Sequence, residues 1–235
     1  MRQTVRTIIL ILVSSLITVI SLSQNMVPGS QALLDKLRLN DGIKGIQNLM
    51  YSDIAGNPFI FRDFHKATLI IGNNERFDVN VRYDIYADEM HLKDGNQVFA
   101  IIHPEKIKMI ETDSIQFIHA WYSKSSGSGK PDGDSYFIVK RAGKCMLLIR
   151  KNIRLQEPEP PKILQDAKPA KFVHQNDTYY FKLEDQNAVQ VKNKKDMLSV
   201  LNDKKADIEK YLNSNNPDLK KIEDLFGLVD FYNNQ

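Results

Sequence analysis

The stretch that decides the fold covers residues 79–101 and reads "VNVRYDIYADEMHLKDGNQVFAI". Val79, Val81 and Tyr83 alternate with polar residues, which is the period-two pattern of a half-buried β-strand. "KDGN" at residues 93–96 contains the Asp-Gly pair that favours a tight hairpin turn. The stretch therefore predicts an antiparallel hairpin with "QVFAI" as its returning strand.

Further segments on both sides of this hairpin have the same strand-like character. They are rich in Val, Ile, Phe and Tyr, which suit a pleated surface. They read "ATLIIG" (67–72), "KIKMIE" (106–111), "IQFIHAWY" (115–122), "SYFIVKRA" (135–142), "KCMLLIRK" (144–151), "AKFVHQND" (170–177) and "TYYFKLEDQNAVQVK" (178–192). Residues 123–135 are predicted to form a solvated hairpin loop, and the Pro-rich residues 157–169 are predicted to cross the surface between elements.

Helical periodicity is found at the two ends of the chain. Residues 29–39, "GSQALLDKLRL", predict a short helix with Ser30 as its N-cap. From Lys194 onward the apolar residues again follow a helical period, with Asp203 and Asn216 as expected N-caps and Pro217 at a first helical position. The sequence thus predicts an α+β protein: an antiparallel β-rich body with a small C-terminal helical segment.

The first residues predict a secretory signal peptide at residues 1–23. Arg2 and Arg6 precede an apolar run at residues 8–20, and Ser21 and Ser23 suit cleavage before Gln24. The alternative is a retained anchor, although the run is short for a membrane span. The expected organisation is then an N-terminal helix and linker (24–58), an antiparallel β-rich domain (59–193) and the helical segment (194–235).

Charge and cysteine content narrow the classes of partner. The chain has 32 basic and 29 acidic residues, and removal of residues 1–23 takes Arg2 and Arg6 but no acid, which leaves about +1. The basic pI is therefore no sign of a polyanionic partner. The single cysteine, Cys145, excludes an intrachain disulfide, and its apolar neighbours predict a buried, unreactive thiol.

The candidate chemical motifs are weak. "SSGSGKPD" resembles a phosphate loop, but Lys124 stands where the first glycine is needed and Pro131 replaces the Ser or Thr after Lys130. The five histidines have no compact metal-ligand spacing; they are His65, His91, His103, His119 and His174. His119 and Trp121 alternate along one strand and should point to the same face, where a structural histidine is the preferred interpretation.

Carboxylates and lysines likewise favour structural interpretations. Asp84, Asp88 and Glu89 lack the glycine and the spacing of a calcium loop, so a solvated strand edge is expected. The lysines of residues 194–235 are balanced by acids, which indicates a solvated helix surface and no nucleic-acid partner. We therefore expect no catalytic residue, no cofactor-binding residue and no metal ligand that can be named from the sequence.

Three motifs carry a resemblance to a known group of proteins. They are "AGNPFI" (55–60), "RYDIYADEM" (82–90) and "FYN" (231–233). Residues 55–233 are similar to uncharacterised exported proteins of Gram-negative envelopes, in which Asn usually stands where this chain has Asp84. The resemblance implies an exported β-rich domain and no catalytic residues.

Two functional hypotheses follow. The first is an exported, non-catalytic envelope protein, periplasmic or extracellular, with a binding or structural role through its β-rich surface and with an envelope protein or glycan as partner. It would meet the membrane only through the signal peptide before cleavage. The second is a hydrolase of envelope polymers whose site is assembled from distant residues. An exposed aromatic patch would favour the first hypothesis, and histidines clustered with carboxylates would favour the second.

Overall fold

The computed structural model of the chain describes residues 30–38, 42–46, 51–124, 130–161, 166–218 and 221–235. The strands are β1 (Ile43–Gly45), β2 (His65–Ile71), β3 (Arg76–Asp84), β4 (Glu89–Asp94), β5 (Gln97–Ile101), β6 (Ile107–Thr112), β7 (Gln116–Ser123), β8 (Gly133–Arg141), β9 (Cys145–Gln156), β10 (Lys171–Leu183) and β11 (Ala188–Gln190). The helices are α2 (Ser30–Arg38), η1 (Pro104–Lys106), α3 (Lys194–Val200), η2 (Asn202–Lys204), α4 (Lys205–Asn215) and α5 (Ile222–Asn233). The predicted β-rich body with a small C-terminal helical part is confirmed.

All described strands belong to one 11-stranded sheet with the order β1-β5-β4-β3-β2-β6-β7-β11-β10-β9-β8. The paired strands are antiparallel except for β7 and β11, which run parallel. β7 also pairs with β8, so β7 to β11 close into a ring. The sheet is therefore open toward β1 and closed at its other end, which leaves few free strand edges.

The hairpin of residues 79–101 forms as predicted around its second turn. Val79, Val81 and Tyr83 are buried, and β4 and β5 are joined through Gly95, whose φ is 56°. The sequence did not predict a break before this turn: β3 ends at Asp84, and residues 85–88 form a turn before β4. The Asp84 side chain accepts hydrogen bonds from the backbone N–H groups of Tyr86 and Ala87 at 2.9 and 3.0 Å, and this local turn stops the strand.

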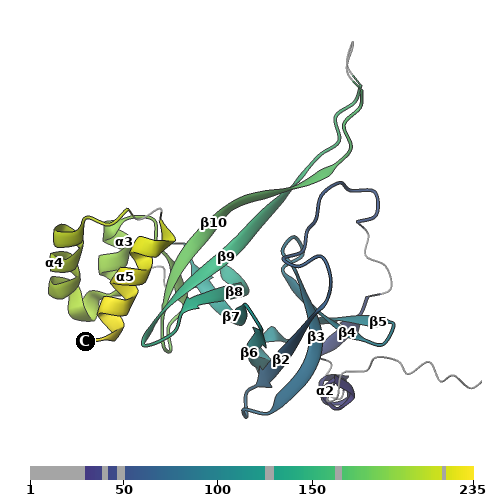
Figure 1. Cartoon of the computed structure of the whole chain (residues 1–235), viewed down its shortest axis with the longest axis horizontal. Helices are drawn as coiled ribbons and strands as arrows, with labels where there is room; N and C mark the ends of the chain where they lie inside the picture. Colours follow the sequence, from purple (N-terminus) through teal and green to yellow (C-terminus); the bar gives the residue numbers. More distant parts are fainter. Residues whose placement is uncertain (1–29, 39–41, 47–50, 125–129, 162–165, 219–220) are drawn as a thin grey trace, which may run out of the picture.

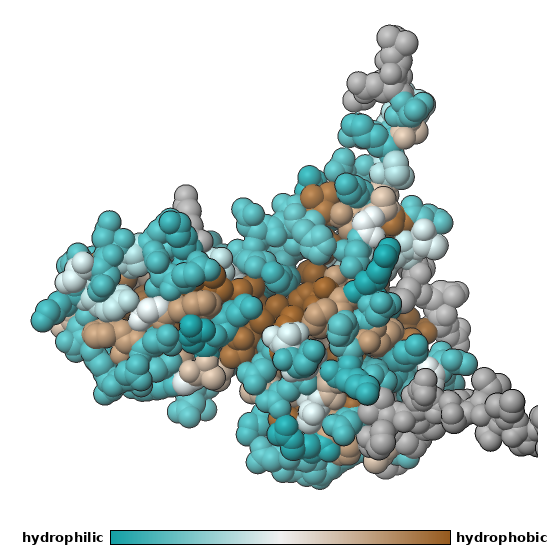
Figure 2. Space-filling view, viewed as in Figure 1, coloured by the Kyte–Doolittle hydropathy of each residue, from teal (hydrophilic) through white to brown (hydrophobic). Residues whose placement is uncertain are grey.

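Three buried clusters stabilise the molecule. One lies between β2–β6 and α2, with Leu33 and Leu37 packed on the sheet. A second fills the inside of the ring, around Phe137 and Tyr180. The third joins α3, α4 and α5 to β9 and β10. Figure 1 shows these helices gathered at one end of the molecule, and Figure 2 shows apolar side chains crossing the waist between them and the sheet.

The N-terminal part contains one element that the sequence did not predict. The helix of residues 30–38 is confirmed, although the side chains of Ser30 and Leu34 lie outside the described part. The expected linker of residues 24–58 contains strand β1, whose Ile43 pairs with Ile101. The predicted signal peptide, residues 1–23, lies outside the described residues.

The long strands β9 and β10 form a ribbon that projects beyond the ring (Figure 1). The described parts of the predicted crossing, residues 157–161 and 166–169, do not pass between separate elements; they continue this ribbon, with a bridge between Glu159 and Lys168. Residues 162–165 lie outside the described part. The base of the ribbon is held where Phe172 N–H donates to the Ala55 carbonyl at 2.8 Å.

The C-terminal helices form where predicted, but two of their caps differ. Asp203 lies in η2 and accepts from the Tyr232 hydroxyl instead of capping α4, whose N-cap is Lys204. Asn216 is the left-handed C-cap of α4, with φ 42°, and α5 begins only at Ile222. Asparagine tolerates this conformation, so the same residue type suits the end of a helix as well as its start.

Candidate functional site

Asp88 closes a gap in the ring where β8 and β9 diverge. The ladder between these strands runs from the pair Arg141–Leu147 only as far as Ile138–Ile149. Beyond it, the Asp88 carboxylate accepts hydrogen bonds from the Ser135 hydroxyl at 2.6 Å and from the Tyr136 backbone N–H at 3.3 Å. The β3–β4 turn thereby fastens the open sheet to the ring, and the expectation of a solvated strand edge at Asp88 is wrong.

Arg150 and the hydroxyl groups around it complete this polar contact. The Tyr83 hydroxyl donates to Asp88 at 2.7 Å, and Arg150 Nη2 lies 3.7 Å from the same carboxylate. Arg150 Nε donates to Ser135 Oγ at 2.9 Å, and its guanidinium lies 5.0 Å from the centre of the Tyr122 ring. The Ser135 hydroxyl thus donates to Asp88 and accepts from Arg150.

Asp84 is also buried, not solvated as expected, with 1% of its surface exposed. Burial raises the pKa of its carboxyl group. His91 lies close by; it contacts Glu89 at 3.3 Å, while its Nδ1 has no hydrogen-bond partner in the described part of the chain. Burial lowers the pKa of His91, although Glu89 and Asp84 act in the opposite direction. Asp84 and His91 are both enclosed, whereas Glu89 reaches the surface; we therefore assign the two buried groups a role within the fold.

The three motifs of the resemblance serve the framework. Phe59 and Asp84 form an isolated bridge, so "AGNPFI" and "RYDIYADEM" lie against each other. Asn233 of "FYN" accepts from the Cys145 backbone N–H at 2.8 Å and donates to the carbonyl of Cys145 at 3.0 Å. These contacts join parts of the chain that are distant in sequence, and none of them forms a reactive group.

A different surface, on the outside of the ring, combines exposure with charge. Trp121, the only tryptophan in the chain, is 53% exposed and is the most exposed of the large hydrophobic residues in the described part. It lies on β7, directly opposite Asp134 of β8. His119, two residues earlier on the same face, contacts Asp134 Oδ2 through Nε2 at 3.0 Å. His119 and Trp121 therefore share one face of β7, as predicted. His119 itself is mostly covered, with 8% of its side chain exposed.

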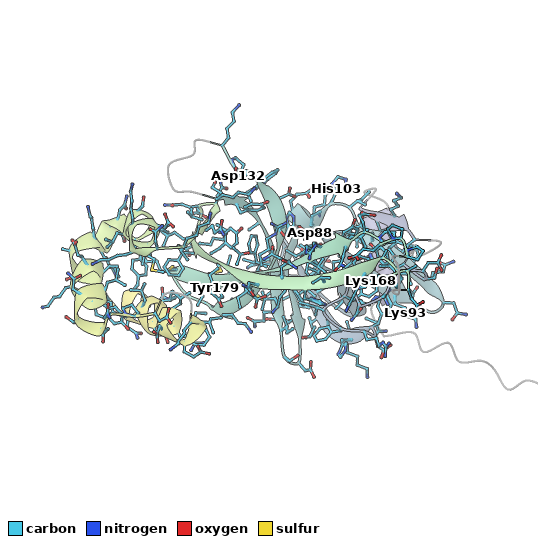
Figure 3. All side chains as sticks on the ribbon, turned by 90° about the horizontal axis from the view of Figure 1, so that it is seen from above. Asp88, Lys93, His103, Asp132, Lys168 and Tyr179 are labelled. Atoms are coloured by element: carbon cyan, nitrogen blue, oxygen red, sulfur yellow. The ribbon has the colours of Figure 1, made fainter. Side chains whose placement is uncertain are left out.

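The short helix η1 adds a second histidine–carboxylate pair beside this face. His103 Nδ1 lies 3.0 Å from Glu105 Oε1. The charge of Glu105 acts on His119, together with those of Asp134 and Asp88. Figure 3 shows His103 and Asp132, which flank η1 and the start of β8, along the same edge of the molecule. We call the five residues Trp121, His119, Asp134, Glu105 and His103 the Trp121 surface.

Burial sets the charge state of the histidine at the centre of this surface. It lowers the pKa of His119, and the nearby carboxylates offset this only in part. His119 is therefore neutral at neutral pH and leaves the charge of Asp134 in place. Beneath it, the Tyr136 ring packs edge-on to the imidazole, with centroids 5.1 Å apart. The Tyr136 hydroxyl is buried and has no hydrogen-bond partner among the described residues.

The remaining candidates from the sequence lie apart. His65 packs on Phe61, with ring centroids 4.0 Å apart, and His174 contacts the Asn57 carbonyl at 3.0 Å.

Cys145 is fully buried, and burial raises the pKa of its thiol to about 12. Residues 125–129 of the rejected phosphate loop lie outside the described part. The described residues contain no group of three or more His, Cys, Asp or Glu side chains placed to hold a metal ion.

Sequence reasoning identified His119 and Trp121 but missed Asp134, Glu105, Ser135 and Arg150. Alternation along β8 places Asp134 and Tyr136 on one face, and that signal could have been used. The contact between η1 and β7 is a tertiary contact, and no local sequence pattern near Glu105 predicts it.

The described helices are too short or too polar to span a membrane. No protein-family profile, no curated protein and no solved structure matches this chain.

Proposed function

We propose that this chain is an exported, non-catalytic binding protein of the bacterial cell envelope, and that it holds a protein partner through the Trp121 surface. The observation that carries the proposal is the 53% exposure of Trp121 on a rigid sheet, opposite the charged Asp134. Aromatic residues of this kind dominate the energetics of many protein interfaces. Export is supported by Arg2, Arg6 and the apolar run that follows them.

A strand position suits such a contact. Trp121 lies on β7. This strand pairs with β8 along one edge and with β6 and β11 along the other. Its backbone is therefore held in place before a partner arrives, so that binding immobilises little beyond the indole side chain. A pre-ordered aromatic group loses less conformational entropy on binding than a group on a loop.

The hydrolase remains the second hypothesis, because the Trp121 surface contains two histidine–carboxylate pairs. A histidine-activated hydrolase would need a hydroxyl or thiol beside His119. Ser135 is engaged by Asp88 and Arg150 instead. We expect no release of soluble fragments when the purified protein is incubated with peptidoglycan or envelope polysaccharide; release that is abolished by Asp134→Asn would support the hydrolase.

Capture from a native envelope extract tests the binding function. The tagged protein should retain a partner that mass spectrometry identifies, and Trp121→Ala should lose it. Tyr86→Ala is the matched control, since Tyr86 is an exposed aromatic residue on the β3–β4 turn, with 44% exposure. Equal capture by the wild type and Trp121→Ala would contradict the proposal.

A further inference from the structure

Each of the two carboxyl groups of the Trp121 surface faces a histidine. Among the described residues, Asp134 is paired with His119 and Glu105 with His103, so the ion pairs of both carboxylates are with histidines. Both carboxylate side chains are about half exposed, at 44% and 57%. Burial holds His119 in its neutral form at neutral pH by lowering its pKa. The exposed indole thus lies opposite the half-exposed carboxyl group of Asp134.

We propose that the Trp121 surface recognises a cationic side chain, lysine or arginine, presented by the protein partner. This inference rests on the proposed binding function and specifies the chemistry of its contact. A cation placed over the face of an indole ring is attracted by the ring electrons, and tryptophan is the best of the aromatic residues for this contact. Asp134 supplies the opposite charge at the adjacent position.

The strand geometry allows one cation to meet both groups. Trp121 and Asp134 are directly opposed on β7 and β8, and opposed side chains on a sheet start about 5 Å apart at their Cβ atoms. A guanidinium or ammonium group that lies on the indole is therefore within reach of the Asp134 carboxylate. The guanidinium of Arg150, on the neighbouring strand β9, does not supply this cation from within the chain, because it is hydrogen-bonded to Ser135 and lies 3.7 Å from Asp88.

Acidic groups also act on the tyrosine beneath this surface. The Tyr136 ring packs edge-on to His119, with ring centroids 5.1 Å apart. Its hydroxyl is buried, and burial and the charges of Asp88 and Glu105 raise its pKa. The carboxyl group of Glu105 thus acts on both His119 and Tyr136, as it would on a cation held at this surface.

The single tryptophan makes the test direct, because a proton–nitrogen NMR spectrum contains one indole signal from this chain. We would titrate the full-length mature protein with acetyl-arginine amide, and separately with acetyl-glutamine amide as the neutral probe of similar size. Sodium chloride at equal ionic strength controls for salt. The arginine probe should shift the indole signal saturably, while the neutral probe and the salt should not. Asp134→Asn should weaken the arginine effect by roughly fivefold.

Equal shifts with the arginine and glutamine probes would overturn the inference. So would the absence of a saturable shift with arginine at tens of millimolar, a range that isolated weak contacts reach. A saturable shift with N-acetylglucosamine and none with arginine would likewise overturn it in favour of a glycan. Failure of the binding function itself is recognised separately. In that case, Trp121→Ala leaves capture from the envelope extract unchanged, whatever the probes do.

Discussion

The Asp88 carboxylate accepts a hydrogen bond of 2.6 Å from the hydroxyl of Ser135, which lies 47 residues further along the chain. This bond fastens the β3–β4 turn to the ring at the point where β8 and β9 diverge. Asp88 reaches it from a left-handed conformation, with φ 56°, which is tolerated by few residues other than glycine and asparagine. The pairing of β6 with β7 already joins the open sheet to the ring, and the Asp88–Ser135 contact adds a second connection.

Asp88→Gly tests that contact without adding backbone strain. Glycine retains the left-handed conformation but removes the acceptors for Ser135, Tyr83 and Tyr136. We expect the free energy of unfolding to fall by about 2 kcal/mol or more, because hydrogen bonds to a charged group are lost. Urea denaturation measures the change. Asp88→Asn, which retains one acceptor and the conformation, should lie between glycine and the wild type.

Stability should also depend on pH through His91. Its pKa is lowered in the folded chain, mainly by burial, so the unfolded chain binds a proton at a higher pH than the folded one. The free energy of unfolding should therefore fall as the pH decreases below about 6.5, and it should stop falling because of His91 once the pH is below the folded pKa. His91→Leu should flatten this slope. An unchanged slope, measured by denaturation at several pH values, would contradict the assignment, and His103→Gln is the exposed control.

Cys145 reports on the attachment of α5. Its thiol is fully buried with a raised pKa, so labelling by a thiol reagent should be slow in the folded protein and fast in denaturant. Asn233→Ala removes the side chain that bonds to the Cys145 backbone and should accelerate labelling. Asn234→Ala, at an exposed neighbouring position, should not. Equal labelling rates in all three proteins would show that Asn233 does not restrain this corner.

Leu228 should contribute more than Phe226 to the packing of the helical segment. It is fully buried among the helices and the sheet, whereas Phe226 is half-buried with the Arg141 guanidinium 3.8 Å from its ring centre. Leu228→Ala should lower the free energy of unfolding by about 2–5 kcal/mol, and Phe226→Ala should cost less. A single cooperative transition is expected in both variants. If α3–α5 were a detachable tail, Leu228→Ala would leave the main transition unchanged.

Local patterns predicted much of the fold. Alternation at Val79, Val81 and Tyr83 identified the buried face of β3, and the helical period from Lys194 onward identified the C-terminal helices, in which Leu225 and Leu228 are buried. Strand β1 was missed because three residues, "IKG", carry no period of their own. Their conformation comes from pairing with β5, which is information from a distant part of the chain.

The errors at Asp84 and Asn216 have a common cause. Both residue types bond readily to nearby backbone groups, so they occur at strand ends, helix starts and helix ends alike. The Trp121 surface shows the corresponding limit for sites. The common face of His119 and Trp121 follows from a period of two, whereas the approach of Glu105 depends on where η1 packs against β7.

Hydroxyl-radical footprinting of Trp121 tests the central claim most directly, because the partner does not have to be identified beforehand. Oxidation of this residue would be compared between the purified protein and the same protein in a native envelope fraction, with Tyr86 as the internal reference. We predict that Trp121 is oxidised readily when purified, as its exposure requires, and is protected in the envelope fraction while Tyr86 is not. Equal oxidation of Trp121 in both samples, relative to Tyr86, would contradict a binding role for this surface.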